Sequence, residues 1–215
     1  MLEDSRFSMA WSDRYPCLSD ATSTTGFDAH YLFHTAWAAR ILAKNRPVLH
    51  TDISSCLRFI SLVSAFIPID FYDYRPAELK LSGLNSNQAD LMSLPFESNS
   101  IDSLSCMHVV EHIGLERYGD PFDPKGDIRA MRELERVLSP NGTLLFVVPV
   151  GENAIIQYNA HRIYSYEQIV QQFAMCDLVN FSYINDAGRF IESANMSDTI
   201  GQTYGCGCFY FSKKK

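Results

Sequence analysis

Several features that would identify common classes of protein are missing from this sequence of 215 residues. No apolar run approaches the roughly 20 residues that a membrane-spanning helix needs, and the acidic N-terminal segment does not resemble a secretory signal. Basic residues are few and the formal net charge is -7, which argues against a nucleic-acid backbone as the main partner. We therefore expect a cytoplasmic protein that binds neither membranes nor nucleic acids.

Cysteine pairs with metal-binding spacing are also missing. None of the six cysteines forms a C-x-x-C pair. Cys206-Gly207-Cys208 has the form of half a metal site, but no second pair of Cys or His stands at ligand spacing. Most of the cysteines lie in apolar runs, where a free thiol behaves as a small hydrophobe. The sequence predicts reduced thiols and no bound metal.

The hydrophobic pattern predicts one α/β domain. Residues 1–26 are polar and irregular, which predicts a flexible arm or lid, and residues 27–215 form a single domain. Apolar segments that predict parallel strands alternate with helical patterns, and two strands close the chain. The strands are expected near 48–53, 68–74, 84–91, 100–109, 143–149, 176–186 and 202–212, and the helices near 27–45, 54–66, 109–115, 127–138 and 165–175. This order predicts a doubly wound, mostly parallel Rossmann-like sheet with a C-terminal antiparallel hairpin.

Two helix starts can be predicted from capping residues. Asp127 is placed to cap the helix that follows it. Ser165 and Gln168 have the spacing of a capping box at the start of the last helix.

Carboxylates mark the ends of the first three predicted strands. These residues are Asp52, Asp73 and Asp90, and His108 stands at the end of the fourth strand. In an open parallel sheet, ligands bind outside the carboxyl ends of the strands. We therefore expect the three carboxylates to converge on one crevice.

The segment from Asp90 to Pro149, together with these acids, resembles the class I S-adenosylmethionine-dependent methyltransferases. The resemblance implies S-adenosylmethionine as the cofactor and assigns roles to the strand ends. Asp73, with Tyr74 beside it, would bind the ribose hydroxyls, and Asp90 would receive the adenine amino group next to Leu91. The remaining implied cofactor contacts lie near the methionine end and at the fourth strand: Asp52, Ser54, Ser55 and His108.

The first loop departs from that family, because residues 52–58 contain no glycine where the family usually has several. The small side chains of Ser54 and Ser55 leave close approach of the cofactor possible. The alternative is a catalytically degenerate methyltransferase fold that serves as a ligand- or partner-binding protein.

A narrower resemblance covers residues 49–183. Gly114 to Pro121, Asp123-Pro124 and Asn159 to Arg162 are similar to an uncharacterised methyltransferase-like family, catalogued as a domain of unknown function with the number 268. The family implies little about the substrate.

Candidate acceptor-side residues follow the fourth strand. Histidine suits proton removal near neutral pH, so His112 or His161 is the expected base, with Glu111 beside it. Arg117 and Arg162 would hold an anionic group of the acceptor, and Tyr118 is a further candidate contact. A small-molecule or saccharide-like acceptor is expected.

His108 to His112 also reads H-x-x-E-H, a pattern of zinc hydrolases. Because no third ligand has a recognisable spacing, and because methyltransferases often carry a similar Glu-His pair at this point, this alternative ranks below the other two.

Overall fold

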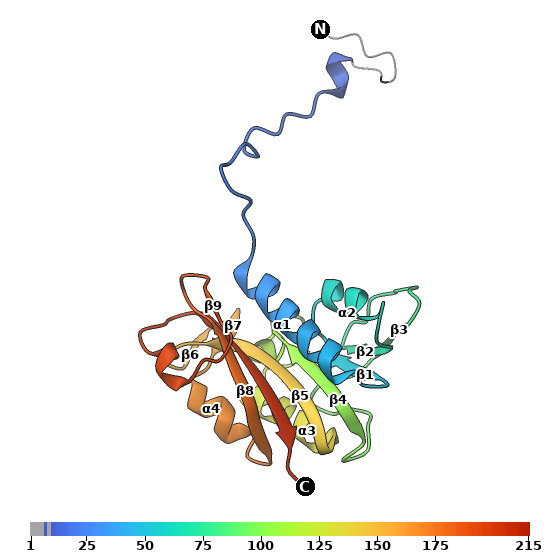
Figure 1. Cartoon of the computed structure of the whole chain (residues 1–215), viewed down its shortest axis with the longest axis vertical. Helices are drawn as coiled ribbons and strands as arrows, with labels where there is room; N and C mark the ends of the chain where they lie inside the picture. The colour runs from blue at the N-terminus through green and yellow to red at the C-terminus, as the bar shows by residue number, and fades with distance from the viewer. Residues whose placement is uncertain (1–6, 8–9) are drawn as a thin grey trace.

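The computed structural model describes Phe7 and residues 10–215 of the chain (Figure 1). Its centre is an eight-stranded sheet with the strand order β3-β2-β1-β4-β5-β10-β8-β9. The parallel half comprises β1 (His50–Ile53), β2 (Ile69–Asp73), β3 (Leu84–Gln88), β4 (Ile101–Met107) and β5 (Leu138–Val150). The antiparallel half comprises β8 (Cys176–Ile184), β9 (Phe190–Ile191) and β10 (Gly205–Lys213).

The last strand lies inside the sheet. β10 pairs antiparallel with both β5 and β8, and β9 is the edge strand beyond β8. The predicted fold, a mostly parallel α/β sheet with antiparallel C-terminal strands, is thus confirmed. Because β10 runs antiparallel to β4 and β5, it starts at the edge where those strands end.

Helices cover both faces of the sheet, as Figure 1 shows. α1 (Ala29–Asn45) and α2 (Leu57–Val63) pack on one face, and α3 (Gly126–Val137) and α4 (Tyr166–Gln172) on the other. Successive residues of β5 point to opposite faces: Phe146 packs with the α3 and α4 side, and Val147 with the α1 and α2 side. Both faces are buried, which explains the nearly continuous apolar run of β5.

Capping explains where the first and last helices begin. Asp28 accepts a hydrogen bond from the backbone N–H of Tyr31 at the start of α1. The predicted capping box of Ser165 and Gln168 is present at the start of α4. Short elements complete the chain: η1 (Trp11–Asp13), η2 (Val110–His112), η3 (Met196–Thr199) and the hairpin of β6 (Ile155–Gln157) with β7 (His161–Ile163).

Two local predictions were wrong. Residues 109–115 form only the 3₁₀ turn η2, because Val109 with φ -131° precedes it outside the helical region and Ile113 with ψ 128° is extended directly after it. Asp127 does not cap α3: it lies inside the helix and is buried against Arg162 and Tyr164.

Residues 10–26 extend away from the sheet and its helices in Figure 1. The aromatic side chains of Trp11 and Tyr15 are exposed. Residues 1–6 and 8–9 of the expected arm lie outside the described residues, and its role as a lid stays a prediction. In the described part of the chain, no helix is both long and apolar enough to cross a bilayer.

Candidate functional site

A cleft and a pocket adjoin at the carboxyl ends of the parallel strands. The cleft has a volume of about 230 Å³ and the pocket about 540 Å³. His112 and Tyr118 line both of them, so a ligand in the cleft and a second ligand in the pocket would meet at these two side chains.

Two of the three predicted carboxylates line the cleft. Asp73 ends β2, and Asp90 follows β3 by two residues. Oδ1 of Asp73 accepts from the backbone N–H of Arg75 at 2.7 Å, and Oδ1 of Asp90 accepts from that of Met92 at 2.8 Å. Within the described residues, Oδ2 of neither carboxylate receives a hydrogen bond. Each aspartate therefore keeps one oxygen to accept a hydrogen bond from a ligand.

The wall beside these carboxylates is apolar. Ala89, Leu91, Val109 and Ile113 contribute to it, and Tyr74 stands at the rim. A mostly apolar wall with a few placed polar groups is typical of a small-molecule or cofactor site.

The glycine-free loop forms a left-handed turn in spite of its sequence. Ser54 has φ 58°, a conformation that glycine adopts most easily. Its hydroxyl donates to the carbonyl oxygen of Tyr72 at 3.3 Å, and the residue lines the cleft. Ser54 therefore takes the backbone geometry expected of a glycine at this position.

Asp52 and Ser55 do not reach the cleft, which corrects their predicted place in the site. Asp52 is fully buried and accepts from the hydroxyl of Ser105 and from the backbone N–H of Ser55, the latter at 3.0 Å. The hydroxyl of Ser55 accepts from the backbone N–H of Met107 at 3.1 Å. Burial raises the pKa of Asp52 to about 6. Asp52 and Ser55 therefore attach the loop to β4 through Ser105 and Met107.

His112 lies where the cleft and the pocket meet. Its Nδ1 is 2.7 Å from the carbonyl oxygen of Ala160. A guanidinium nitrogen of Arg117 also lies 3.1 Å from Nδ1, but the contact with the carbonyl oxygen is shorter. Because a carbonyl can only accept, Nδ1 carries the proton and Nε2 keeps a lone pair. Burial lowers the pKa of His112, so the ring is neutral near pH 7. The Glu111 carboxylate lies 3.7 Å from Nε2, where it would stabilise the ring once protonated.

His161, Arg117 and Tyr118 also line the pocket. Burial lowers the pKa of His161, whose ring centre lies 6.3 Å from that of His112. Arg117 donates to the carbonyl of Ala160 at 2.8 Å and stacks on the ring of Tyr118. These predicted acceptor-side residues are thus gathered in one place.

Arg162 is elsewhere, which corrects its predicted role. Its side chain is buried, lies 3.5 Å from the Asp127 carboxylate and donates to the carbonyl oxygen of Ile113 at 2.7 Å. It lines neither the cleft nor the pocket. Arg162 therefore joins α3 to the segment after η2 and does not contact a ligand in the pocket.

His108 lies in the pocket and not in the cofactor cleft where it was expected. Its Nδ1 donates to Oε1 of Glu111 at 2.9 Å, and its Nε2 lies 3.3 Å from Sγ of Cys206. His108 and His112 do not share a helix face, because η2 has only three residues. The geometry that H-x-x-E-H requires in a zinc hydrolase is absent from these two residues.

Three aromatic residues that line the pocket were not found from the sequence. His30 and Tyr31 come from the first turn of α1, and Tyr204 precedes β10. None of them belongs to a motif with recognisable spacing. Their only signal is position, because the start of α1 and the start of β10 both face the edge where β4 ends.

The strand order and the ligand-sized cleft at the strand ends define a class I methyltransferase fold. A chain from the complex of the Haloferax volcanii Trm112 methyltransferase activator with its methyltransferase has a TM-score of 0.59 and 18% identity, covering 87% of this chain and 91% of that one. The N-methyltransferase NodS from Bradyrhizobium japonicum, solved with S-adenosylhomocysteine, has a TM-score of 0.57 and 12% identity, covering 87% of this chain and 88% of that one. The 1,6-didemethyltoxoflavin-N1-methyltransferase of Burkholderia thailandensis was solved with bound 1,6-didemethyltoxoflavin and S-adenosylhomocysteine. It has a TM-score of 0.56 and 10% identity, covering 85% of this chain and 79% of that one.

The chain belongs to the family described as "Caenorhabditis protein of unknown function, DUF268", which matches residues 87–199. This finding confirms the narrower resemblance. No curated protein matches the sequence.

Proposed function

We propose that this protein is an S-adenosylmethionine-dependent methyltransferase that acts on a small polar acceptor, such as a saccharide-like molecule. The observation that carries the proposal is the placement of Asp73 and Asp90 in one apolar cleft, which adjoins a histidine-lined pocket. When bound, the cofactor supplies an electrophilic methyl group.

The cleft fits the nucleoside part of that cofactor. Oδ2 of Asp73 would accept from ribose hydroxyls, and Oδ2 of Asp90 would accept from the adenine amino group. Leu91 and Val109 would pack against the adenine ring. The left-handed turn at Ser54 brings loop backbone to the cleft without a glycine, which answers the main objection from the sequence.

The pocket fits the removal of a proton from an acceptor. Neutral His112 holds its Nε2 lone pair where the pocket meets the cleft, and Glu111 would stabilise the resulting imidazolium. His161 is the second candidate base on the same wall. Arg117 would attract a negatively charged group of the acceptor, since its guanidinium lines the pocket.

Calorimetry with S-adenosylmethionine and S-adenosylhomocysteine tests the proposal. Asp73→Ala is expected to weaken the binding of both ligands by about 10- to 100-fold, because hydrogen bonds to a charged group contribute about 1.5–3 kcal/mol. Asp70→Ala is the matched control: Asp70 is on the same strand and accepts from Asn85 at 2.8 Å, but does not line the cleft.

If neither ligand binds at millimolar concentration, the enzyme proposal fails and the degenerate binding protein replaces it. If binding occurs but Asp73→Ala and Asp70→Ala weaken it equally, the cofactor lies elsewhere than in this cleft.

A further inference from the structure

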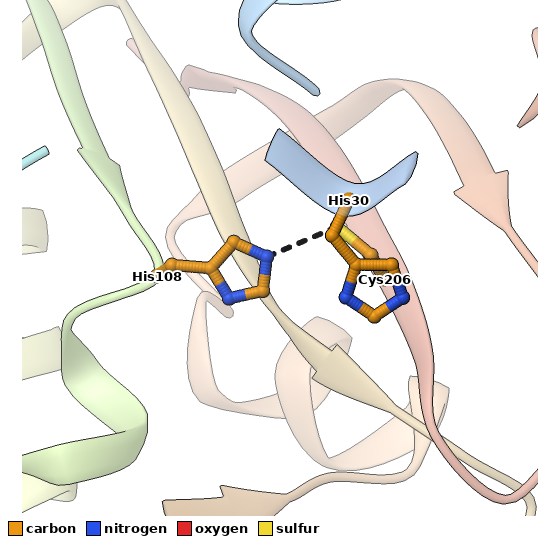
Figure 2. Close-up of side chains that lie close together, drawn as sticks. All are labelled: His30, His108 and Cys206. Atoms are coloured by element: carbon orange, nitrogen blue, oxygen red, sulfur yellow. Dashed lines mark hydrogen bonds between the residues drawn. The ribbon is translucent and has the colours of Figure 1, made fainter. Parts of the chain in front are cut away.

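Three potential metal ligands from distant parts of the chain converge at the base of the pocket. Figure 2 shows His30 from α1, His108 after β4 and Cys206 on β10, with the contact between His108 and Cys206 drawn as a dashed line. One ligand atom from each residue lies within 4.8 Å of those of the other two. We propose that these residues bind a zinc ion.

The spacing suits a shared tetrahedral ion. Zinc binds imidazole nitrogen at about 2.0–2.1 Å and thiolate sulfur at about 2.3 Å, which sets the two ligand atoms about 3.6 Å apart at a tetrahedral angle. Nε2 of His108 and Sγ of Cys206 are 3.3 Å apart. His30 lies in the first turn of α1 with its ring parallel to that of His108, and it is only partly buried. To bind the same ion, the His30 side chain would rotate so that one of its ring nitrogens points at the ion.

A buried carboxylate orients His108 as a metal ligand. Glu111 accepts from Nδ1 of His108, which fixes the proton on Nδ1 and directs the Nε2 lone pair at Cys206. Metal-binding histidines commonly donate their second nitrogen to a carboxylate in this way. The same hydrogen bond would raise the basicity of Nε2 toward a metal ion.

Two polar atoms beside the three ligands are buried without a hydrogen-bond partner in the described part of the chain. Oε2 of Glu111 is buried and has no hydrogen-bond partner within the described residues, although the side chain is only 1% exposed. Nε2 of His34, whose ring packs edge-on against that of His108, is likewise buried without a partner. Burying a carboxylate without compensation is costly, and a cation beside His108 would offset that cost.

Two imidazoles and one thiolate leave one position of a tetrahedral ion open. Cys206 is fully buried, whereas His30 and His108 both line the pocket, so the open position faces the pocket. On binding, the S–H bond of Cys206 breaks, its proton passes to solvent and a zinc–sulfur bond forms. Three protein ligands with an open fourth position are the arrangement of catalytic zinc sites.

A role in the reaction follows only if the proposed methyl transfer holds. An acceptor hydroxyl or thiol bound at the open position would lose its proton more easily, next to His112. Binding of zinc itself does not depend on that activity.

The experiment measures metal content and affinity in the full chain. Metal-stripped protein is loaded with Zn²⁺, dialysed and assayed by elemental analysis, and loaded with Co²⁺ for absorption spectroscopy. One metal ion per chain is expected, with a thiolate-to-cobalt charge-transfer band. Loss of a group that hydrogen-bonds to a metal ligand weakens metal binding by roughly 10- to 100-fold. His30→Ala removes a ligand itself and should weaken Zn²⁺ binding by more than that. Cys206→Ser should abolish the charge-transfer band.

His161→Ala is the control, because His161 lines the same pocket but is not one of the three ligands. Circular dichroism checks that each variant is folded. If Cys206→Ser, which changes a buried residue, does not fold, His30→Ala alone tests the proposal. A chain that holds less than one zinc ion, or that keeps its affinity in His30→Ala, would overturn the proposal. Calorimetry with S-adenosylmethionine, run on stripped and loaded protein, separates this failure from failure of the methyltransferase proposal.

Discussion

Glu111 and His108 are joined by a buried hydrogen bond of 2.9 Å between Oε1 and Nδ1, in the wall of the pocket. The bond fixes which nitrogen of His108 is free, and that nitrogen faces Cys206. Glu111 also lies 3.7 Å from Nε2 of His112. One carboxylate therefore touches both the proposed zinc ligand and the proposed base.

If the zinc site exists, Glu111→Gln should weaken it. Glutamine keeps the shape and an accepting oxygen but removes the charge, and loss of such a group costs about 10- to 100-fold in metal affinity. Competition with a chromophoric chelator measures the change. Glu116→Gln is the matched control, because Glu116 is exposed and bonds to Tyr158. Equal affinities in the two variants would show that Glu111 does not act on the metal.

Arg162→Ala should lower the free energy of unfolding by about 3–5 kcal/mol. The substitution leaves the buried Asp127 carboxylate without its cation, and uncompensated buried charges cost about this much. Arg129→Ala, which removes a largely exposed ion pair from the same helix, should cost at most about 1 kcal/mol. Urea unfolding compares them. If Arg162→Ala keeps wild-type stability but weakens acceptor binding, Arg162 belongs to the site after all.

Asp52 should make folding stability fall with rising pH. Burial raises its pKa from 3.8 to about 6, so the folded protein binds more protons than the unfolded chain between these values. The free energy of unfolding of the wild type minus that of Asp52→Asn should therefore decrease by about 2–3 kcal/mol from pH 4 to pH 7. Below pH 4 the difference should level off. Parallel stability curves for the two proteins would show that Asp52 is not the group responsible.

Ser54 should tolerate glycine better than a larger residue. The left-handed conformation costs a residue with a Cβ about 1–2 kcal/mol, and glycine avoids that cost. Ser54→Gly should leave the free energy of unfolding unchanged or raise it. Ser54→Val should lower it by about 1–2 kcal/mol, because a β-branched side chain tolerates the left-handed region less well than serine does. Thermal and urea unfolding check both. A glycine variant that is as unstable as the valine variant would mean that the serine hydroxyl, and not the backbone conformation, holds the turn.

The sequence allowed the cleft to be predicted but not all of its members. Asp73 and Asp90 follow apolar strands, and parallel strands end at a common edge, so their convergence follows from alternation alone. Asp52 shares that pattern. Its side chain is buried instead and bonds to Ser105 and Ser55. Neighbouring residues on a strand face opposite ways, so a position near the strand end does not by itself direct a side chain into the cleft.

Local pattern also misjudged the segment after β4. The apolar run around Val109 and Val110 predicts a helix, yet His108 turns into the left-handed region and only three residues follow in a 3₁₀ turn. The competing contacts are tertiary: His108 bonds to Glu111, and His112 bonds to Ala160 across the pocket.

The order of strands and helices, the start of α4 at Ser165 and the line of acids at the strand ends were determined by the sequence itself, since each depends on neighbours a few residues apart. The grouping of His30, His108 and Cys206, and the burial of Arg162 against Asp127, were decided only by the tertiary structure. Those contacts join residues that no local periodicity relates. They exist because β10 inserts antiparallel beside β5 and because α1 begins over the edge where β4 ends.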